Sequence, residues 1–297
     1  MPRFKLTIEY AGTRFSGWQI QKNARTIQGE IDRAVRTVTG RSDFELYGSG
    51  RTDAGVHALA QVAHLDVSTT LPPETLVRRL NDELPPDINL LNALVVSHRF
   101  HARHDAVARR YVYQIATRRT AFAKSFVWWV KDRLSVDRMR TAAHAFVGMR
   151  DFRSFVQADE DDQSLAAPER GNRRGREGPK SASGGSTLVL VESLDVVEEG
   201  DLILIGVEGS HFLWKMVRRV VGVLVEIGRG GLDPGAAATF LTTSSTAPAR
   251  LTAPAAGLFL EHVWYPGDAR DVPLRAATLL PHAGSSRTPS TNRTTSA

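Results

Sequence analysis

The segment GSGRTDAGVH, residues 48 to 57, separates two stretches whose apolar pattern predicts β-strands, 44 to 47 and 61 to 67. Its three glycines allow the backbone to bend tightly. The same ten residues carry Arg51 and Asp53, two charged side chains that a simple bend does not require. The segment therefore determines how the first strands connect, and it raises the question of what its charged residues do.

Two interpretations of this loop follow from the residues alone. In the first, Asp53, Ala54 and Gly55 form a turn, which aspartate and glycine both favour. In the second, Asp53 is catalytic, because an ionised carboxylate is a nucleophile toward a sugar carbon or an electron-poor ring once it is oriented and desolvated. Arg51 then holds the carboxylate ionised or occupies the space that a displaced base leaves. The residues themselves leave both interpretations open.

Three other kinds of site fit the sequence poorly. A phosphate-binding loop needs a different glycine spacing and a following helix, whereas a predicted strand follows here. A two-carboxylate glycosidase needs a second acid beside Asp53, and the loop offers none. Two sets of residues contain candidate metal ligands without matching a known spacing: Asp53 with His57 and His64, and His98 with His101 and His104. We therefore expect no metal site.

The composition is that of a globular protein with a basic charge balance. The chain has 297 residues, enough for about two domains, and its formal net charge is +6. A positive balance favours a polyanionic partner, above all nucleic acid. Six arginines concentrate this charge between positions 97 and 119, and we expect this stretch to contact phosphates: Arg99, Arg103, Arg109, Arg110, Arg118 and Arg119.

Three further features of the sequence indicate in which cellular compartment the protein works. No run approaches 18 apolar residues, so no transmembrane helix is expected. The first ten residues alternate like a strand and lack the apolar core of a signal peptide, which indicates a cytoplasmic protein. The sequence contains no cysteine, which excludes disulfides and thiolate metal sites and fits a reducing compartment.

Residues 1 to 105 are predicted to form an α+β half that carries the loop. Residues 4 to 10 alternate between apolar and polar side chains, as a half-buried strand does. Thr26 is placed to cap a helix whose apolar face runs over residues 27 to 38. A second helix and a strand over residues 90 to 96 complete this half, and the short connections favour antiparallel pairing.

Residues 106 to 265 are predicted to form a second α+β half of similar design, with a cleft between the halves. Its expected elements are a strand over 111 to 115, a helix over 135 to 147, a hairpin of 188 to 197 with 202 to 207, a helix over 211 to 227 and a strand over 258 to 264. Residues 159 to 186 and 266 to 297 have too little apolar surface to offset the entropy of ordering, so both are predicted to remain unfolded.

The loop also carries a resemblance to a known family. The motif GSGRTDAGVHALAQVAHL closely resembles the catalytic motif of tRNA pseudouridine synthases of the TruA family. Further blocks resemble the family in the same order: YAGTRFSGWQIQ with TIQGEIDRAV, RLNDELPPDI, FHARHDAVARRYVY, GSHFLWKMVRRVVGVLVEIGRG and APAAGLFLEHVWY. Together the blocks span residues 4 to 265, which is most of the chain.

This resemblance implies the pseudouridine synthase fold, with two ferredoxin-like or RRM-like halves around a mostly antiparallel central sheet. It implies an isomerase that converts uridine to pseudouridine in the anticodon stem-loop of tRNA, at positions 38, 39 and 40. It also implies a homodimer that needs no organic cofactor and no metal. The alternatives are a non-catalytic RNA-binding module or chaperone of the same fold, and a metal-dependent nuclease, which the missing acid cluster disfavours.

Residue by residue, the resemblance assigns the chemistry to the loop and to the second half. Asp53 matches the catalytic aspartate, and Arg51 matches the arginine that enters the space left by the target base. Tyr111 matches the tyrosine that stacks on the target uracil, and Leu258 matches a leucine of the pocket. Arg218 matches the arginine that pairs with the aspartate. An intact set of these residues argues against a non-catalytic protein.

Some positions depart from the family pattern. The long polar insertion follows DFRSF, and Lys215 stands where the family often has histidine. The sequence APAAGL departs from the usual double proline. These differences concern RNA docking and substrate range more than the chemistry. We expect Asp53 and Arg218 to form a buried pair, and we expect Arg219 to contribute far less to stability.

Overall fold

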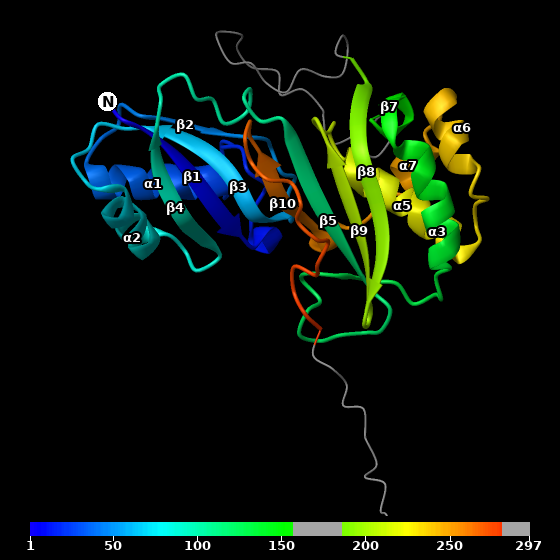
Figure 1. The fold of residues 1–297 in the computed structure, drawn as a ribbon. Coiled ribbons are helices and arrows are strands. Elements are labelled where there is room, and N and C mark those ends of the chain that lie inside the picture. The colour runs from blue at the N-terminus through cyan, green and yellow to red at the C-terminus, as the bar shows by residue number, and fades with distance from the viewer. Residues whose placement is uncertain (157–185, 281–297) are drawn as a thin grey trace, which may run out of the picture.

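The computed structural model describes residues 1 to 156 and 186 to 280 of the chain (Figure 1). These residues form one sheet of ten strands with helices packed against it. Eight strands follow one another in the order β4-β1-β3-β10-β5-β9-β8-β7, while β2 pairs with β3 and β6 pairs with β5. Among the strands of the described residues, only the pairings of β10 with β3 and of β5 with β6 are parallel, so the predicted α+β class and mostly antiparallel sheet are confirmed.

The strands are β1 (Arg3–Tyr10), β2 (Glu45–Gly48), β3 (His57–Asp66), β4 (Ile88–Val96), β5 (Ala108–Ala116), β6 (Trp128–Trp129), β7 (Gly148–Asp151), β8 (Leu188–Glu199), β9 (Leu202–Gly209) and β10 (Leu258–Trp264). The helices are α1 (Ile27–Thr39), α2 (Pro73–Glu83), α3 (Val136–Ala143), α5 (Met216–Arg229), α6 (Ala236–Thr242) and α7 (Ala247–Arg250). Within the described ranges, no helix is long and apolar enough to cross a membrane.

The predicted strand and helix at the start of the chain form for the expected physical reasons. Every second side chain of β1 is buried, and the side chains between them are half-buried. Thr26 caps α1 by accepting a hydrogen bond from the backbone N–H of Gly29. The helix ends at Gly40, which adopts the left-handed conformation that glycine allows at this position.

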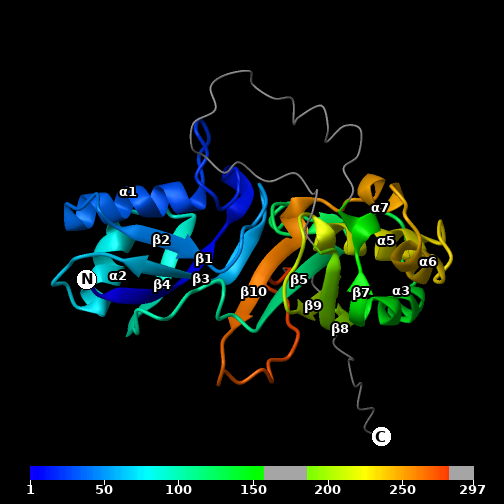
Figure 2. The same cartoon turned by 90° about the horizontal axis from the view of Figure 1, so that it is seen from above.

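The two larger apolar cores of the described residues lie at the two ends of the sheet. Figures 1 and 2 show α1 and α2 at one end, and α3, α5, α6 and α7 at the other. The central strand β10 contributes to both cores, because Leu258 belongs to the core that includes α5 and Leu260 belongs to the core that includes α1. Tyr111 of β5 packs against both cores. The middle of the sheet therefore joins the two ends of the molecule.

Helix α5 begins at Met216, whereas the apolar pattern predicts a start at residue 211. Lys215 has a φ angle of 57°, and among the described residues it alone combines a side chain with a positive φ. A residue in this left-handed conformation interrupts an α-helix. The backbone N–H of Met216 bonds to the carbonyl of Leu213 instead, at 3.1 Å. Because of this local conformation, the helix begins more than one turn later than the sequence predicts.

Residues 266 to 280 contact the sheet, although the sequence predicts that they belong to an unfolded tail. Several contacts hold them: for example, Arg110 Nη1 donates to Val272 O at 2.6 Å, Gln114 Nε2 donates to Thr278 Oγ1 at 3.0 Å, and Leu274 packs in a cluster with Leu202 and Leu204. The prediction failed here because the partners on β5 and β9 are far away in sequence. The rest of the predicted tail, and the insertion up to residue 185, lie outside the described residues.

The middle of α5 approaches the segment before β10 so closely that only glycine fits. A Cβ atom on Gly222 would lie 1.6 Å from the backbone oxygen of Leu251. At Gly228 of the same helix, a Cβ atom would instead lie 2.9 Å from the sulfur of the flexible Met139 side chain. At Gly222 the conflict is with backbone that leads into β10 and cannot easily move. At Gly228 a movement of the Met139 side chain relieves the conflict.

Replacing Gly222 by alanine should therefore lower the free energy of unfolding by about 3 kcal/mol, the upper part of the usual range for overpacking. This loss should occur although alanine favours the helix by about 1 kcal/mol over glycine. Gly228→Ala is the matched control and should change stability by less than about 1 kcal/mol. Urea denaturation of both variants measures the difference, and equal effects would contradict the close approach at Gly222.

Candidate active site

The loop that carries Asp53 joins β2 to β3 and contains a defined turn. β2 ends at Gly48 and β3 begins at His57. Within the loop, the backbone N–H of Val56 donates to Asp53 O at 3.2 Å, and Gly55 has a φ angle of 79°. A type II turn requires a positive φ at its third residue, which glycine adopts without strain. The turn and the catalytic interpretation are compatible, because Asp53 is the first residue of this turn.

Asp53 faces Arg218, which extends from the first turn of α5. Nη1 of Arg218 lies 3.5 Å from Oδ2 of Asp53. The Nε atom of Arg218 donates to Ala253 O at 2.7 Å, and this bond fixes the guanidinium. The Asp53 side chain is 25% exposed and the Arg218 side chain is 15% exposed. The structure thus brings the two residues together in a pair that is shielded but still open to a ligand.

Opposing effects act on the charge of Asp53. Burial raises the pKa of its carboxyl above the ordinary value of 3.8, because the ionised form loses contact with water. The positive charges of Arg218, Lys215 and Arg219 lower this pKa, and burial is the larger effect. No role at the site is predicted for Lys215 from the sequence. Its position directly before the turn of α5 that carries Arg218 was the available signal.

Tyr111 of β5 lies within electrostatic reach of the same carboxylate. Its ring packs edge-on against Phe212, with 5.3 Å between the ring centroids. Burial raises the pKa of the Tyr111 hydroxyl, and the charge of Asp53 adds to this shift while Arg109 opposes it. The phenol therefore remains neutral, and it offers an aromatic surface beside Asp53.

Arg51 and Leu258 have contrasting surroundings. Arg51 is exposed at the surface of the loop that carries Asp53. Leu258 is only 5% exposed, pairs with Tyr113 across the sheet, and belongs to the core beneath α5. The structure therefore leaves Arg51 open to a large ligand and surrounds Leu258 with core residues.

Arg109 has surroundings that differ from the expected phosphate contact. Its guanidinium donates hydrogen bonds to four backbone oxygens: Ala106 at 3.1 Å, Ser210 at 2.7 Å, Ser49 at 3.2 Å and Arg103 at 2.8 Å. Burial lowers the pKa of Arg109 from its ordinary value. Because Ser49 begins the loop that carries Asp53, this arginine connects that loop to the segments around it. Guanidinium donors that bind carbonyls are not open to a phosphate.

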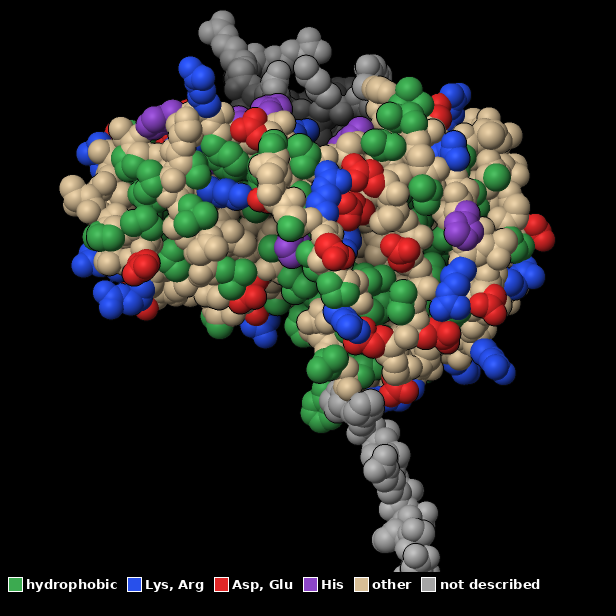
Figure 3. Space-filling view, in the orientation of Figure 1, with side chains coloured by type: hydrophobic (Ala, Val, Ile, Leu, Met, Phe, Trp, Pro, Cys, Tyr) green, Lys and Arg blue, Asp and Glu red, His purple; other side chains and the backbone are tan. Residues whose placement is uncertain are grey.

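Arg110 is also used inside the protein. It is 7% exposed, forms an ion pair with Glu261 of β10 and donates to Val272 O. The expectation that Arg109 and Arg110 contact phosphates is therefore revised, because both guanidinium groups hold segments of the chain together. Figure 3 shows that Lys and Arg side chains are interspersed with Asp and Glu on the face seen there. The net positive charge does not gather into one patch on this face.

Arg219, rather than Arg218, is the more buried of the two neighbouring arginines. Arg219 is 0% exposed, and its Nη1 donates to Phe155 O at 3.0 Å. Its guanidinium also lies 5.8 Å from the ring centroid of Trp214. The expectation that Arg219 contributes far less to stability is not supported. Position 219 points into the C-terminal core, whereas position 218 points toward the loop of Asp53.

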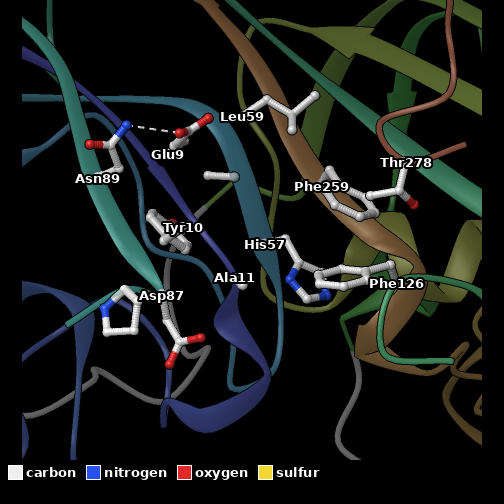
Figure 4. A pocket seen from close by; sticks show the side chains of 12 residues that line it. Glu9, Tyr10, Ala11, His57, Leu59, Asp87, Asn89, Phe126, Phe259 and Thr278 are labelled. Atoms are coloured by element: carbon white, nitrogen blue, oxygen red, sulfur yellow. Dashed lines mark hydrogen bonds between the residues drawn. The ribbon is translucent and has the colours of Figure 1, made fainter. Parts of the chain in front are cut away.

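A cavity of about 250 Å³ lies near the first residue of β3, and Asp53 does not line it. Figure 4 shows His57, Phe126 and Phe259 on one side of this cavity, and Tyr10 and Asp87 on the other. The ring of His57 stacks on Phe259, with 4.7 Å between centroids, and its Nδ1 accepts the backbone N–H of Gly12. Burial lowers the pKa of His57. This histidine is a structural residue behind the loop.

Two more of the histidines considered as metal ligands, His64 and His101, accept backbone hydrogen bonds. Nδ1 of His64 accepts the backbone N–H of Ala102, and Nδ1 of His101 accepts those of Arg103 and His104. These bonds use the lone pairs that a metal would need. Within residues 1 to 156 and 186 to 280, no group of three or more His, Cys, Asp or Glu side chains is arranged to hold a metal ion.

Comparison with known proteins gives a consistent result. A family model described as "tRNA pseudouridine synthase" matches residues 6 to 105 and 177 to 266. A protein of Rhodopseudomonas palustris named tRNA pseudouridine synthase A is 39% identical over 272 residues, covering 89% of this chain and 100% of that protein. A protein of Limosilactobacillus fermentum with the same name is 37% identical over 278 residues, covering 91% of this chain and 98% of that protein.

A solved structure, a Cbf5-Nop10-Gar1 complex, matches with a TM-score of 0.29 and 11% identity, over 74% of this chain and 54% of the matched chain. That similarity is too low to add to the assignment. The family model covers more than half of the chain, and both relatives exceed 30% identity over most of their length. This chain therefore belongs to the tRNA pseudouridine synthase family.

Proposed function

We propose that this chain isomerises uridine to pseudouridine in the anticodon stem-loop of tRNA, at positions 38, 39 and 40. The observation that carries the proposal is the carboxylate of Asp53, which is 25% exposed and lies 3.5 Å from Arg218. The names of the relatives support tRNA as the substrate. The positions within tRNA rest on the resemblance of the motif around Asp53.

The proposed reaction exchanges one bond for another. The bond between N1 of uracil and C1′ of ribose breaks, and a bond between C5 and C1′ forms. C5 loses a proton and N1 gains one, so the composition of the nucleotide is unchanged. Asp53 acts on the nucleotide while the base is detached. Arg218 orients the carboxylate, and the neutral ring of Tyr111 stacks on the uracil.

The remaining site residues take roles that fit their exposure. Arg51 enters the RNA where the target uridine leaves the stack, because it is exposed on the same loop as Asp53. Leu258 supports the site from the core. The exposed members of the arginine-rich stretch take the phosphate contacts in place of the two internal arginines; they are Arg99, Arg103 and Arg119.

The resemblance also supports two features of the whole molecule. We include in the proposal a cytoplasmic homodimer, in which residues 1 to 105 and 106 to 265 are the two halves of each subunit. The uridine then enters between the loop of the first half and the residues of the second half that face it.

Asp53→Asn should lower the rate of isomerisation by about a thousandfold or more, because the change keeps the shape and removes the reacting charge. Mapping of pseudouridine in tRNA incubated with the protein measures this loss. tRNA affinity should stay close to that of the wild type. The melting temperature should not fall at neutral pH. Because the pKa of the Asp53 carboxyl is raised in the folded protein, its ionisation destabilises the fold, and the neutral asparagine avoids this cost.

Asp87→Asn is the matched control for this experiment. The Asp87 side chain is 26% exposed, close to the 25% of Asp53, and its nearest arginine, Arg14, lies 4.0 Å away at an exposed position. This variant should retain full activity. An Asp53→Asn protein with activity near that of the wild type would remove the basis of the proposal.

The pH dependence of single turnovers should report the state of Asp53. Activity requires the ionised carboxylate, so the rate should rise with pH through a midpoint above 3.8. Lys215→Met removes a charge that lowers this pKa, and the midpoint should therefore move to higher pH. Lys124→Met, at an exposed position of another loop, should leave the midpoint in place. A midpoint that moves to lower pH in Lys215→Met would contradict the electrostatic account.

Arg110→Gln should lower the free energy of unfolding by about 3 kcal/mol, because it leaves Glu261 buried without its partner. The dependence of tRNA affinity on salt should not change, since Arg110 is not open to phosphates. Arg99→Gln, at an exposed position, should leave stability unchanged. Chemical denaturation and binding at several salt concentrations measure both quantities. If the slope of tRNA affinity against salt falls in Arg110→Gln by the amount expected for about one phosphate contact, Arg110 does contact a phosphate, as the sequence predicts.

A further inference from the structure

A buried network of four polar side chains lies directly behind the loop of Asp53. Ser49 and Thr52 belong to the loop, Tyr10 ends β1, and Gln61 lies in the middle of β3. The four residues are 1%, 6%, 4% and 0% exposed, respectively. Buried polar groups require partners, and the proposed reaction uses none of these four. Their arrangement therefore calls for another explanation.

The hydrogen bonds of the network allow only one orientation of the Gln61 amide. Ser49 Oγ donates to Gln61 Oε1 at 2.7 Å, Gln61 Nε2 donates to Gly50 O at 3.2 Å and to the Tyr10 hydroxyl at 3.4 Å, and that hydroxyl lies 2.8 Å from Thr52 Oγ1. Gly50 O can only accept, so it requires the amide nitrogen of Gln61 on its side. The amide oxygen is then left for Ser49. Gln61 thus holds two consecutive loop residues with one side chain.

These bonds hold a part of the loop that packing alone does not hold. A Cβ atom on Gly50 would meet nothing within 4 Å, so no atom packs against the side of Gly50 where a side chain would stand. Thr52 is held through its side chain by Tyr10 and through its backbone oxygen by the N–H of Trp18, at 3.1 Å. Asp53 is the next residue. The network therefore sets the position of the backbone directly before Asp53.

We propose that Gln61 and Tyr10 are positioning residues, which set the location of the Asp53 carboxylate relative to Arg218 through Gly50 and Thr52. The inference rests on the proposed role of Asp53. A displacement of about 1 Å in a reacting group can cost about a hundredfold in rate, so a polar network of this kind has a large effect on turnover. Burial raises the pKa of the Tyr10 hydroxyl to about 12, which keeps it a neutral partner at working pH.

Gln61→Leu and Gln114→Leu form a matched pair for the test. Gln114 is also 0% exposed, and its side chain bonds to Phe126 O at 2.9 Å and to Thr278 at 3.0 and 3.2 Å, away from the loop. Both variants should lose stability. Only Gln61→Leu should lower kcat, by about tenfold or more, with KM for tRNA changed by less than about twofold. Equal losses of kcat in the two variants would overturn the inference.

A second pair of variants decides the question if Gln61→Leu does not fold. Thr52→Val keeps the shape of the side chain and removes the oxygen that bonds to Tyr10. Thr52→Ser keeps that oxygen. The serine variant should keep a kcat near that of the wild type and the valine variant should lose it. Equal kcat values in the two variants would overturn the inference.

Hydrogen exchange of the backbone amides between positions 49 and 56 gives a readout that does not depend on turnover. Exchange should accelerate there in Gln61→Leu, or in Thr52→Val if the former does not fold, and not in Gln114→Leu. If the wild-type protein forms no pseudouridine but exchange still accelerates in the variant, the proposed function is contradicted, and the effect of the network on the loop stands. Unchanged exchange together with an active wild type would contradict the positioning role alone.

Discussion

Strand β10 reaches the centre of the sheet from the far end of the chain and pairs on both sides, parallel with β3 and antiparallel with β5. Its pairing with β5 covers most of its length, whereas its pairing with β3 consists of Phe259 with His57 and Leu260 with Ala58. That short pairing lies at the start of β3, directly after the loop of Asp53. The distance between Asp53 and the residues of β5 and α5 that face it therefore depends on a seam of two residue pairs, and side-chain bonds across this seam reinforce it.

Two arginines contribute bonds that reinforce this seam, in addition to the hydrogen bond between His57 Nε2 and Ser125 O at 3.0 Å. Arg109 reaches from β5 to the backbone of Ser49, and Arg218 reaches from α5 to the carboxylate of Asp53. Arg218 is itself fixed by the carbonyl of Ala253, just before β10. Charged groups that are oriented before a substrate arrives need no reorganisation during the reaction. Burial raises the pKa of Asp53 and fixed cations lower it. This balance is thus built from the same contacts that align the loop of Asp53 with β5 and α5.

The sequence predicts those parts of the fold that depend on local pattern. The alternation of β1 and the cap of α1 at Thr26 need only neighbouring residues, and both are present. The start of α5 was missed because it depends on the left-handed conformation of Lys215, which an apolar pattern does not report. At the site, the motif identifies Asp53, and the structure adds its surroundings. The network around Gln61 was missed because its members are close only after β1 and β3 pair.

The arginine-rich stretch shows why charge in a sequence does not identify a binding surface by itself. Successive residues of a strand point to opposite faces, so Arg109 and Arg110 meet different partners on the two sides of β5. One binds backbone oxygens and the other binds Glu261, and each thereby gives up the donors that a phosphate would use. Arginines that remain exposed keep those donors available to RNA. Burial therefore divides a run of like residues into those that hold the fold together and those that can meet a polyanion.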